Sequence, residues 1–206
     1  MTRDSARADV LDVAAAIVDV ASATGDDDLT TMKLQKLVYY VQAWHLADHG
    51  TPLFDEPIEA WPEGPVVRRL WQHHRGARRV HGFRFGSADQ LSPEDRALVE
   101  EVVDRYGRLS GDALSELTHA ERPWKTARGD LSPRDSSNDV IDPEIMRASY
   151  RRGSVSAERA VSFAIANNRL EGLAPPVELL PDLYAVATGE RSADEVIAEQ
   201  LAAVFG

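Results

Sequence analysis

The stretch between Leu29 and Gly50 constrains the fold more than any other part of the chain. A threonine, Thr30 or Thr31, stands where a helix needs an N-cap, and Gly50 stands where a left-handed residue commonly ends one. Between these caps, apolar side chains recur at the spacing of one helix face: Leu34, Leu37, Val38, Val41 and Trp44. The sequence therefore predicts a buried helix that runs to His49.

Helical signals also dominate the rest of the chain. Ser92 and Pro93 precede two acidic residues, which is a strong helix start because serine caps, proline fits the first turn and acids favour the helix dipole. Residues 75–91 and 131–139 are predicted to be loops, and Arg122-Pro123-Trp124 is predicted to start a turn. Apolar spacing and caps predict further helices over residues 6–23, 66–74, 93–109, 110–119 and 142–150.

The pattern changes between residues 52 and 65, where a short β-hairpin is predicted. An approximate alternation of apolar residues begins at Ile58, and prolines blunt the strand edges. Gly64 and Pro65 are predicted to form a turn. The predicted fold class is therefore mainly α: a helical bundle-like domain with a small β-hairpin.

An internal boundary is predicted at Arg151-Arg-Gly-Ser154. It divides the chain into a helical domain, residues 1–152, and a short three-helix C-terminal appendage, residues 153–206. Ser192 and Glu195 form a capping box for the last of these helices. Because three short helices make too small a core to be stable alone, we expect the appendage to lean on a partner.

Composition narrows the class of protein. The chain has 206 residues, no cysteine and a net charge of −11, so a disulfide framework, a thiolate metal site and a cysteine nucleophile are excluded. We expect no membrane segment and a cytoplasmic protein, since there is no long apolar run and early aspartates interrupt any signal peptide. The acidic balance suits a basic partner and repels nucleic-acid phosphates over most of the surface.

Three blocks of the first part carry a resemblance. Residues 32–40, 59–67 and 117–124, in this order, resemble the Panacea (SocA-like) antitoxin domain, and the resemblance extends over most of the first 150 residues. It implies an all-helical domain with a small hairpin, paired with a cognate protein toxin encoded nearby. The family-motif residues are Lys33, Leu34, Gln35, Lys36, Leu37, Tyr39, Tyr40, Trp61, Gly64, Pro65, Val66, His119, Glu121 and Trp124.

The physical interpretation of these motif residues is mostly structural. Leu34, Leu37 and Tyr40 are of types that usually lie in a core, as does Trp44 one turn on. Trp124, after a proline, is expected to anchor its segment onto the main helix.

The appendage resembles VbhA-like antitoxins, which silence Fic-type toxins. The resemblance rests on Asn167, Arg169, Glu171 and Gly172, and on the final helices. It implies that Glu171 pairs with an active-site arginine of a Fic-type AMP-transferase and so obstructs ATP binding. The family has Ser or Thr four residues before the glutamate, whereas this chain has Asn167, which can also donate and accept a hydrogen bond.

Other clusters of polar residues have two interpretations. His45 and His49 are spaced to hold zinc, but a packed or surface pair is preferred because no third ligand is near and no metal is expected. His119 and Glu121 could act as an acid–base pair, although a structural hydrogen bond is preferred. Six arginines without an acid lie between residues 68 and 84: Arg68, Arg69, Arg75, Arg78, Arg79 and Arg84.

We interpret this basic segment as a solvated loop or a contact for an acidic partner. Promoter DNA is the weaker alternative, because no helix-turn-helix is evident. The sequence as a whole predicts an antitoxin that binds a protein toxin, with no enzymatic activity and no cofactor. A proteolytic adaptor, which the SocA resemblance implies for some members, and a hydrolase using His119 and Glu121 are the alternatives. Homo-oligomerisation stays open.

Overall fold

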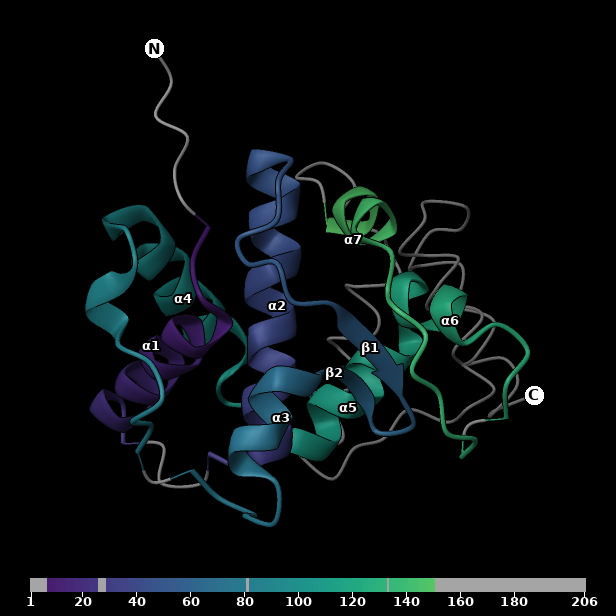
Figure 1. The fold of residues 1–206 in the computed structure, drawn as a ribbon, viewed down its shortest axis with the longest axis horizontal. Helices are drawn as coiled ribbons and strands as arrows, with labels where there is room; N and C mark the ends of the chain where they lie inside the picture. The colour runs from purple at the N-terminus through teal and green to yellow at the C-terminus, as the bar shows by residue number, and fades with distance from the viewer. Residues whose placement is uncertain (1–6, 26–28, 81, 133, 151–206) are drawn as a thin grey trace, which may run out of the picture.

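The computed structural model describes residues 7–25, 29–80, 82–132 and 134–150. In this part of the chain, one long helix, α2 (Thr31–His49), stands at the centre of the molecule (Figure 1). The other elements, in chain order, are α1 (Val10–Ala23), β1 (Ile58–Trp61), β2 (Gly64–Val67), α3 (Arg68–His74), η1 (Ala88–Gln90), α4 (Pro93–Tyr106), α5 (Gly111–Ala120), α6 (Arg122–Arg128) and α7 (Pro143–Tyr150). The predicted mainly α fold with a small hairpin is confirmed.

Side-chain caps explain where the helices begin. The N-cap oxygens of Asp9, Thr30, Ser92 and Ser110 each accept a hydrogen bond from a backbone N–H in the first turn of α1, α2, α4 and α5. Gly50 ends α2 with a φ of 74°, a left-handed conformation that glycine adopts without a steric penalty. The start predicted from Thr30 and the end predicted at Gly50 are both confirmed.

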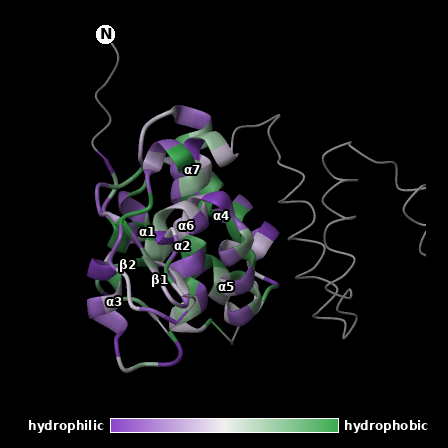
Figure 2. Cartoon of the chain, turned by 90° about the vertical axis from the view of Figure 1, so that its right-hand side faces the viewer, coloured by the Kyte–Doolittle hydropathy of each residue, from purple (hydrophilic) through white to green (hydrophobic). Residues whose placement is uncertain are grey.

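The hydrophobic core is built around α2. This helix packs against α1, α4, α5, α7 and β2, so it has neighbours on most of its circumference. Leu34, Leu37 and Tyr40 have no exposed surface and Trp44 is 7% exposed, as predicted. In the side view, hydrophobic and hydrophilic stretches alternate along the helices, whereas α3 at the edge is largely hydrophilic (Figure 2).

The hairpin differs from its prediction at the turn. Trp61 pairs with Gly64, so Pro62 and Glu63 form the turn and the Gly64-Pro65 pair opens β2. The predicted helix from residue 66 likewise starts later, at Arg68, because the two valines before it pair with β1. Pro65 has no N–H to donate, yet it can occupy this position of β2. Its partner in β1, Ala60, donates its own N–H to Asp139 on the opposite edge of β1, so the Ala60–Pro65 pair needs no hydrogen bond from the proline.

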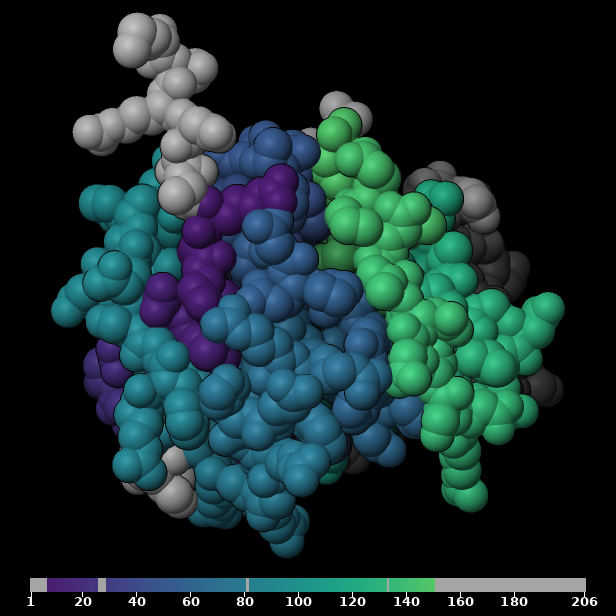
Figure 3. Space-filling view, viewed as in Figure 1, coloured from purple at the N-terminus to yellow at the C-terminus, as the bar shows by residue number. Residues whose placement is uncertain are grey.

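The outer edge of β1 is covered by the segment before α7. Ala60 N–H donates to Asp139 O at 2.8 Å, and Ile141 N–H donates to Ile58 O at 2.8 Å. A single bridge therefore joins Glu59 to Val140, and in Figure 3 the green segment lies directly against the hairpin region. This pairing limits the exposed backbone edge of the hairpin.

Other predictions are corrected as well: the predicted loop over residues 75–91 contains a short 3-10 helix, η1, and the helices differ at three places. The first helix begins at Val10 rather than residue 6, since Asp9 is its cap, and the helix from Pro93 ends at Tyr106 rather than residue 109. Arg122 to Arg128, predicted to start a turn, forms α6, because Pro123 in the first turn needs no N–H partner.

The predicted boundary at residues 151–154 and the whole C-terminal appendage lie outside the described residues, so the two-part division stays a prediction. Among the described residues, no helix is both long and apolar enough to cross a membrane.

Candidate functional site

The motif residues of α2 hold the hairpin against the helix. Val67 N–H donates to Gln35 Oε1 at 2.8 Å, and Gln35 Nε2 lies 3.4 Å from Val67 O, so the amide side chain replaces a neighbouring strand. Gln35 Nε2 is also 2.9 Å from His74 Nε2 at the end of α3. One buried glutamine thereby fixes the end of β2 and the position of α3.

Lys36 acts on the same strand from the next position. Its side chain is 1% exposed, and Nζ donates to Pro65 O at 3.1 Å. Burial lowers the pKa of Lys36 to about 7, and the nearby charge of Glu63 opposes this only in part. A buried amine with a backbone carbonyl as acceptor is chiefly a structural contact.

Gly64 makes the approach of Lys36 possible. Its φ is 96°, and a Cβ atom there would lie 2.8 Å from both Lys36 Cε and Thr118 Oγ1. The glycine of the motif is therefore required by a close contact between β2, α2 and α5, and not by the turn predicted at this position.

The remaining aliphatic and basic motif residues are also buried. Leu34 and Leu37 lie in the core, and Val66 on β2 is 6% exposed. Lys33 is 5% exposed and donates its backbone N–H to the cap, Thr30 Oγ1, at 3.1 Å.

Glu121 is the centre of a tyrosine cluster. It is 7% exposed at the junction of α5 and α6, and its carboxylate accepts hydrogen bonds from Tyr39 at 3.3 Å, Tyr40 at 3.4 Å and Tyr150 at 2.5 Å. Tyr40 also stacks on Tyr106, with ring centroids 4.1 Å apart. The cluster joins α2 and α7 to the α5–α6 junction. It is a buried polar network whose groups are hydrogen-bonded to one another.

His119 and Trp124 form a separate stack beside the hairpin turn. Their ring centroids are 4.0 Å apart, and Trp124 Nε1 donates to Trp61 O at 3.0 Å. The hydrogen bond of Trp124 thus goes to β1, whereas α5, which precedes it in the same segment, packs against α2. Burial, followed by the charges of Lys36 and Arg128, lowers the pKa of His119 to about 4.

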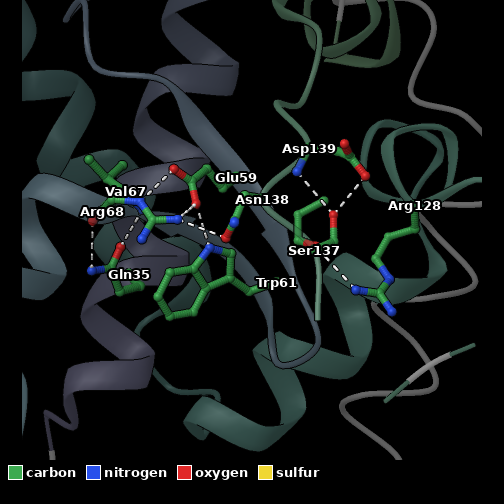
Figure 4. A network of polar contacts seen from close by, with 10 residues as sticks. Gln35, Glu59, Trp61, Val67, Arg68, Arg128, Ser137, Asn138 and Asp139 are labelled. Carbon is green, nitrogen blue, oxygen red and sulfur yellow. Dashed lines mark hydrogen bonds and ion pairs between the residues drawn. The ribbon is translucent and has the colours of Figure 1, made fainter. Parts of the chain in front are cut away.

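The outward side of the hairpin carries a polar network that sequence reasoning missed (Figure 4). Arg68 donates to Glu59 from Nε at 2.9 Å and from Nη2 at 2.6 Å, a bidentate pair, and also donates to Asn138 Oδ1 at 2.7 Å. Trp61 Nε1 donates to Glu59 Oε2 at 2.7 Å. Burial raises the pKa of Glu59, but the hydrogen bonds from Arg68 and Trp61 outweigh it and leave the pKa below its usual value.

One signal for this network is present in the sequence. Glu59 and Trp61 are two positions apart on a strand, so their side chains share a face. Asn138 and Arg128 carry no such signal, because they come from distant segments. Arg128 donates to Ala60 O, Asp135 O and Ser132 O, and so holds the loop before α7 against β1.

The basic segment is partly neutralised within the chain. Arg69 pairs with Asp9 at 2.8 Å and also with Glu56, as Arg68 does with Glu59.

His45 and His49 have stacked rings, with centroids 4.3 Å apart, which agrees with the interpretation of the two histidines as a packed pair.

A cavity of about 1070 Å³ lies elsewhere, where α2 and α5 begin. Basic and acidic residues both contribute to its wall, among them Lys33, Arg78, Arg108 and Asp104. Apart from Lys33, the motif residues are absent from its described lining.

Motif residues from three stretches of sequence thus lie around the hairpin, whereas Tyr39, Tyr40 and Glu121 form the separate tyrosine cluster. The α2 residues and the α5–α6 residues approach its inner side, and Trp61 reaches its outer side. Most of them are scaffold. The predicted inhibitory residues, Asn167, Arg169, Glu171 and Gly172, lie outside the described residues.

The described structure is thus a helical domain that holds a two-stranded hairpin through buried motif residues. Residues 34–125 match the family model described as "Antitoxin SocA-like, Panacea domain". The chain is 32% identical over 139 residues to Antitoxin SocA of Caulobacter vibrioides, an alignment that covers 60% of this chain and 72% of that protein. The chain belongs to the SocA-like Panacea antitoxin family.

Residues 158–203 match a second family model, described as "Antitoxin VbhA". Both resemblances found in the sequence are therefore confirmed. No solved structure matches the chain.

Proposed function

We propose that this chain neutralises its cognate protein toxin by stoichiometric binding rather than by turnover. The observation that supports this most strongly is that two antitoxin families match consecutive, non-overlapping stretches, residues 34–125 and 158–203. A helical binding domain and a neutralising segment on one chain would act on the same toxin.

The second stretch favours a Fic-type AMP-transferase as the toxin. In the proposed mechanism, the Glu171 carboxylate takes an active-site arginine of the toxin away from ATP, and charge-assisted pairs of this kind are strong. Asn167 precedes Glu171 by four positions, so both would lie on one face of a helix and enter the site together.

The described domain would supply interface area and not catalysis. The Glu121 carboxylate is buried beneath three tyrosine hydroxyls, and Nε2 of His119 is buried without a hydrogen-bond partner among the described residues. A hydrolase would need an accessible acid–base pair, so this geometry gives the hydrolase hypothesis no support.

Co-expression with the toxin encoded next to this chain tests the proposal. We expect the wild type to restore growth and Glu171→Arg to fail, because a cation would repel the toxin's arginine. Glu178→Arg is the matched control, with the same charge change in the same stretch but outside the motif. If Glu171→Arg neutralises as well as the wild type, obstruction of the active site is wrong.

The half-life of the toxin in cells separates inhibition from delivery to a protease, which the SocA resemblance leaves open. An inhibitor should leave that half-life unchanged or lengthen it. A shorter half-life in the presence of the antitoxin would favour the adaptor.

A further inference from the structure

Two tryptophans lie side by side on the outward side of the hairpin. Trp61 on β1 and Trp71 on α3 are both half-buried, and their ring centroids are 5.3 Å apart at an interplanar angle of 62°. The Arg68 guanidinium lies 5.4 Å from the Trp61 ring centre, and that of Arg75 lies 5.7 Å from the Trp71 ring centre. We call Trp61, Arg68, Trp71 and Arg75 the Trp–Arg patch.

Two of the four side chains of the patch, Trp61 and Arg68, are held in place by other parts of the chain. Glu59 accepts from both Trp61 and Arg68, so one buried carboxylate orients both side chains (Figure 4). Asn138, from the segment that covers β1, fixes Arg68 from the other side. The Arg68 side chain is still 43% exposed. Binding through side chains that are already ordered loses less conformational entropy.

The segment that carries most of the patch is basic, although the chain as a whole is acidic. Residues 68–84 contain six arginines and no acid, whereas the whole chain has a net charge of −11. Arg68 and Arg69 have carboxylate partners within the chain, but Arg75 is exposed and lies over Trp71. Tryptophan and arginine are the residue types that dominate protein–protein hot spots.

The charges and tryptophans of the Trp–Arg patch fit a protein partner better than a nucleic-acid partner. A DNA-binding surface needs several free cations along the phosphates, but Glu59, Glu56 and Asp9 neutralise part of this segment. The helix that presents the patch, α3, has seven residues. Half-buried tryptophans add apolar area, which phosphates do not use.

We propose that the Trp–Arg patch is the surface on which the Panacea domain binds an acidic face of its cognate toxin. This inference rests on the proposed antitoxin function and adds a second contact, separate from the C-terminal segment. Trp71 provides the apolar anchor, and Arg75 provides the charge that complements the toxin.

Titration of purified full-length protein with the purified toxin tests the patch. We expect Trp71→Ala and Arg75→Glu each to raise the Kd about tenfold or more, as loss of a hot-spot residue does. The loss for Arg75→Glu should shrink as salt is raised, because exposed charges are screened. Arg75→Lys should bind nearly as well as the wild type. Arg108→Glu, with the same charge change between α4 and α5, is the matched control and should stay within about twofold.

The outcomes separate this inference from the proposed function. If the wild type binds the toxin and both patch variants bind it equally well, the assignment of the Trp–Arg patch as the toxin-binding surface is wrong, while the antitoxin proposal stands. If the variants keep toxin binding but lose binding to operon-upstream DNA, or lose self-association in sedimentation, the patch serves DNA or a second copy, and the inference is overturned. If the wild type does not bind the toxin, both proposals fail.

Discussion

The two sides of the hairpin differ in what their side chains contact. On the inner side, Gln35 and Lys36 bind the backbone of β2, and Gly64 leaves room for the lysine. On the outer side, Trp61 and Arg68 are ordered by Glu59 and remain partly exposed. The comparison teaches that most of the family motif builds the scaffold, and that the side chains proposed to meet a partner lie on the other side of the hairpin.

The largest effect is expected from the tyrosine cluster, deep on the inner side. Tyr40→Ala removes a side chain with no exposed surface that stacks on Tyr106, so we expect a loss of about 3–5 kcal/mol in the free energy of unfolding. Tyr40→Phe keeps the ring and removes the hydroxyl that donates to Glu121, so it should cost about 1 kcal/mol. Urea unfolding measures both. Equal losses for the two variants would mean that packing is not the main contribution.

A smaller loss of stability is expected at Gly64, where β2 lies close to α2 and α5. Gly64→Ala places a methyl group 2.8 Å from Lys36 Cε and Thr118 Oγ1 at a positive φ, so we expect destabilisation of about 2–3 kcal/mol. Gly76→Ala is the matched control, since its φ is also positive, at 86°, but no atom lies within 4 Å of the added Cβ. The difference between the two thermal unfolding curves isolates the close contact. Similar losses at both positions would assign the effect to backbone strain alone.

Lys36 predicts an effect of a different kind, which is spread over several pH units. Its pKa is about 7 in the folded protein, below its ordinary value of 10.5, so the unfolded chain binds more protons between these values. Stability conferred by this group is therefore full above 10.5, falls as the pH is lowered, and is lost below about 7. Relative to Lys36→Met, the wild type should gain up to about 1.4 kcal/mol per pH unit within this window.

Denaturant unfolding of both proteins at several pH values between 7 and 10.5 gives this difference. A pH-independent difference would contradict the burial of a charged amine. If the stability of the wild type relative to Lys36→Met instead falls as the pH rises, the sign is opposite to the predicted one. That result would contradict the burial of Lys36 against β2.

Local signals predicted the helical frame well. The N-cap of α2, its end at Gly50 and the Ser92-Pro93 start of α4 depend on neighbouring residues only, and the structure confirms each. Gly64 and Pro65 were misassigned to a turn because the reason for the glycine lies in α2 and α5, far away in the sequence. Spatial proximity of that kind cannot be read from spacing.

The candidate site was predicted less completely than the fold. The motif resemblance located Gln35, Lys36 and Glu121, but their contacts depend on segments that only the tertiary structure brings together. Asn138 and Trp71 received no role from the motif, and both lie in the outer network or patch. The account of residues 167–172 remains a prediction.

The most direct test is to measure stability and toxin affinity together for one variant from each side of the hairpin. Tyr40→Ala removes a fully buried ring that stacks on Tyr106, so it should lower the unfolding temperature but keep the wild-type Kd while folded. Arg75→Glu should keep the unfolding temperature and weaken the Kd. The opposite pattern, with folded Tyr40→Ala losing affinity and Arg75→Glu binding normally, would contradict the division between scaffold and binding surface.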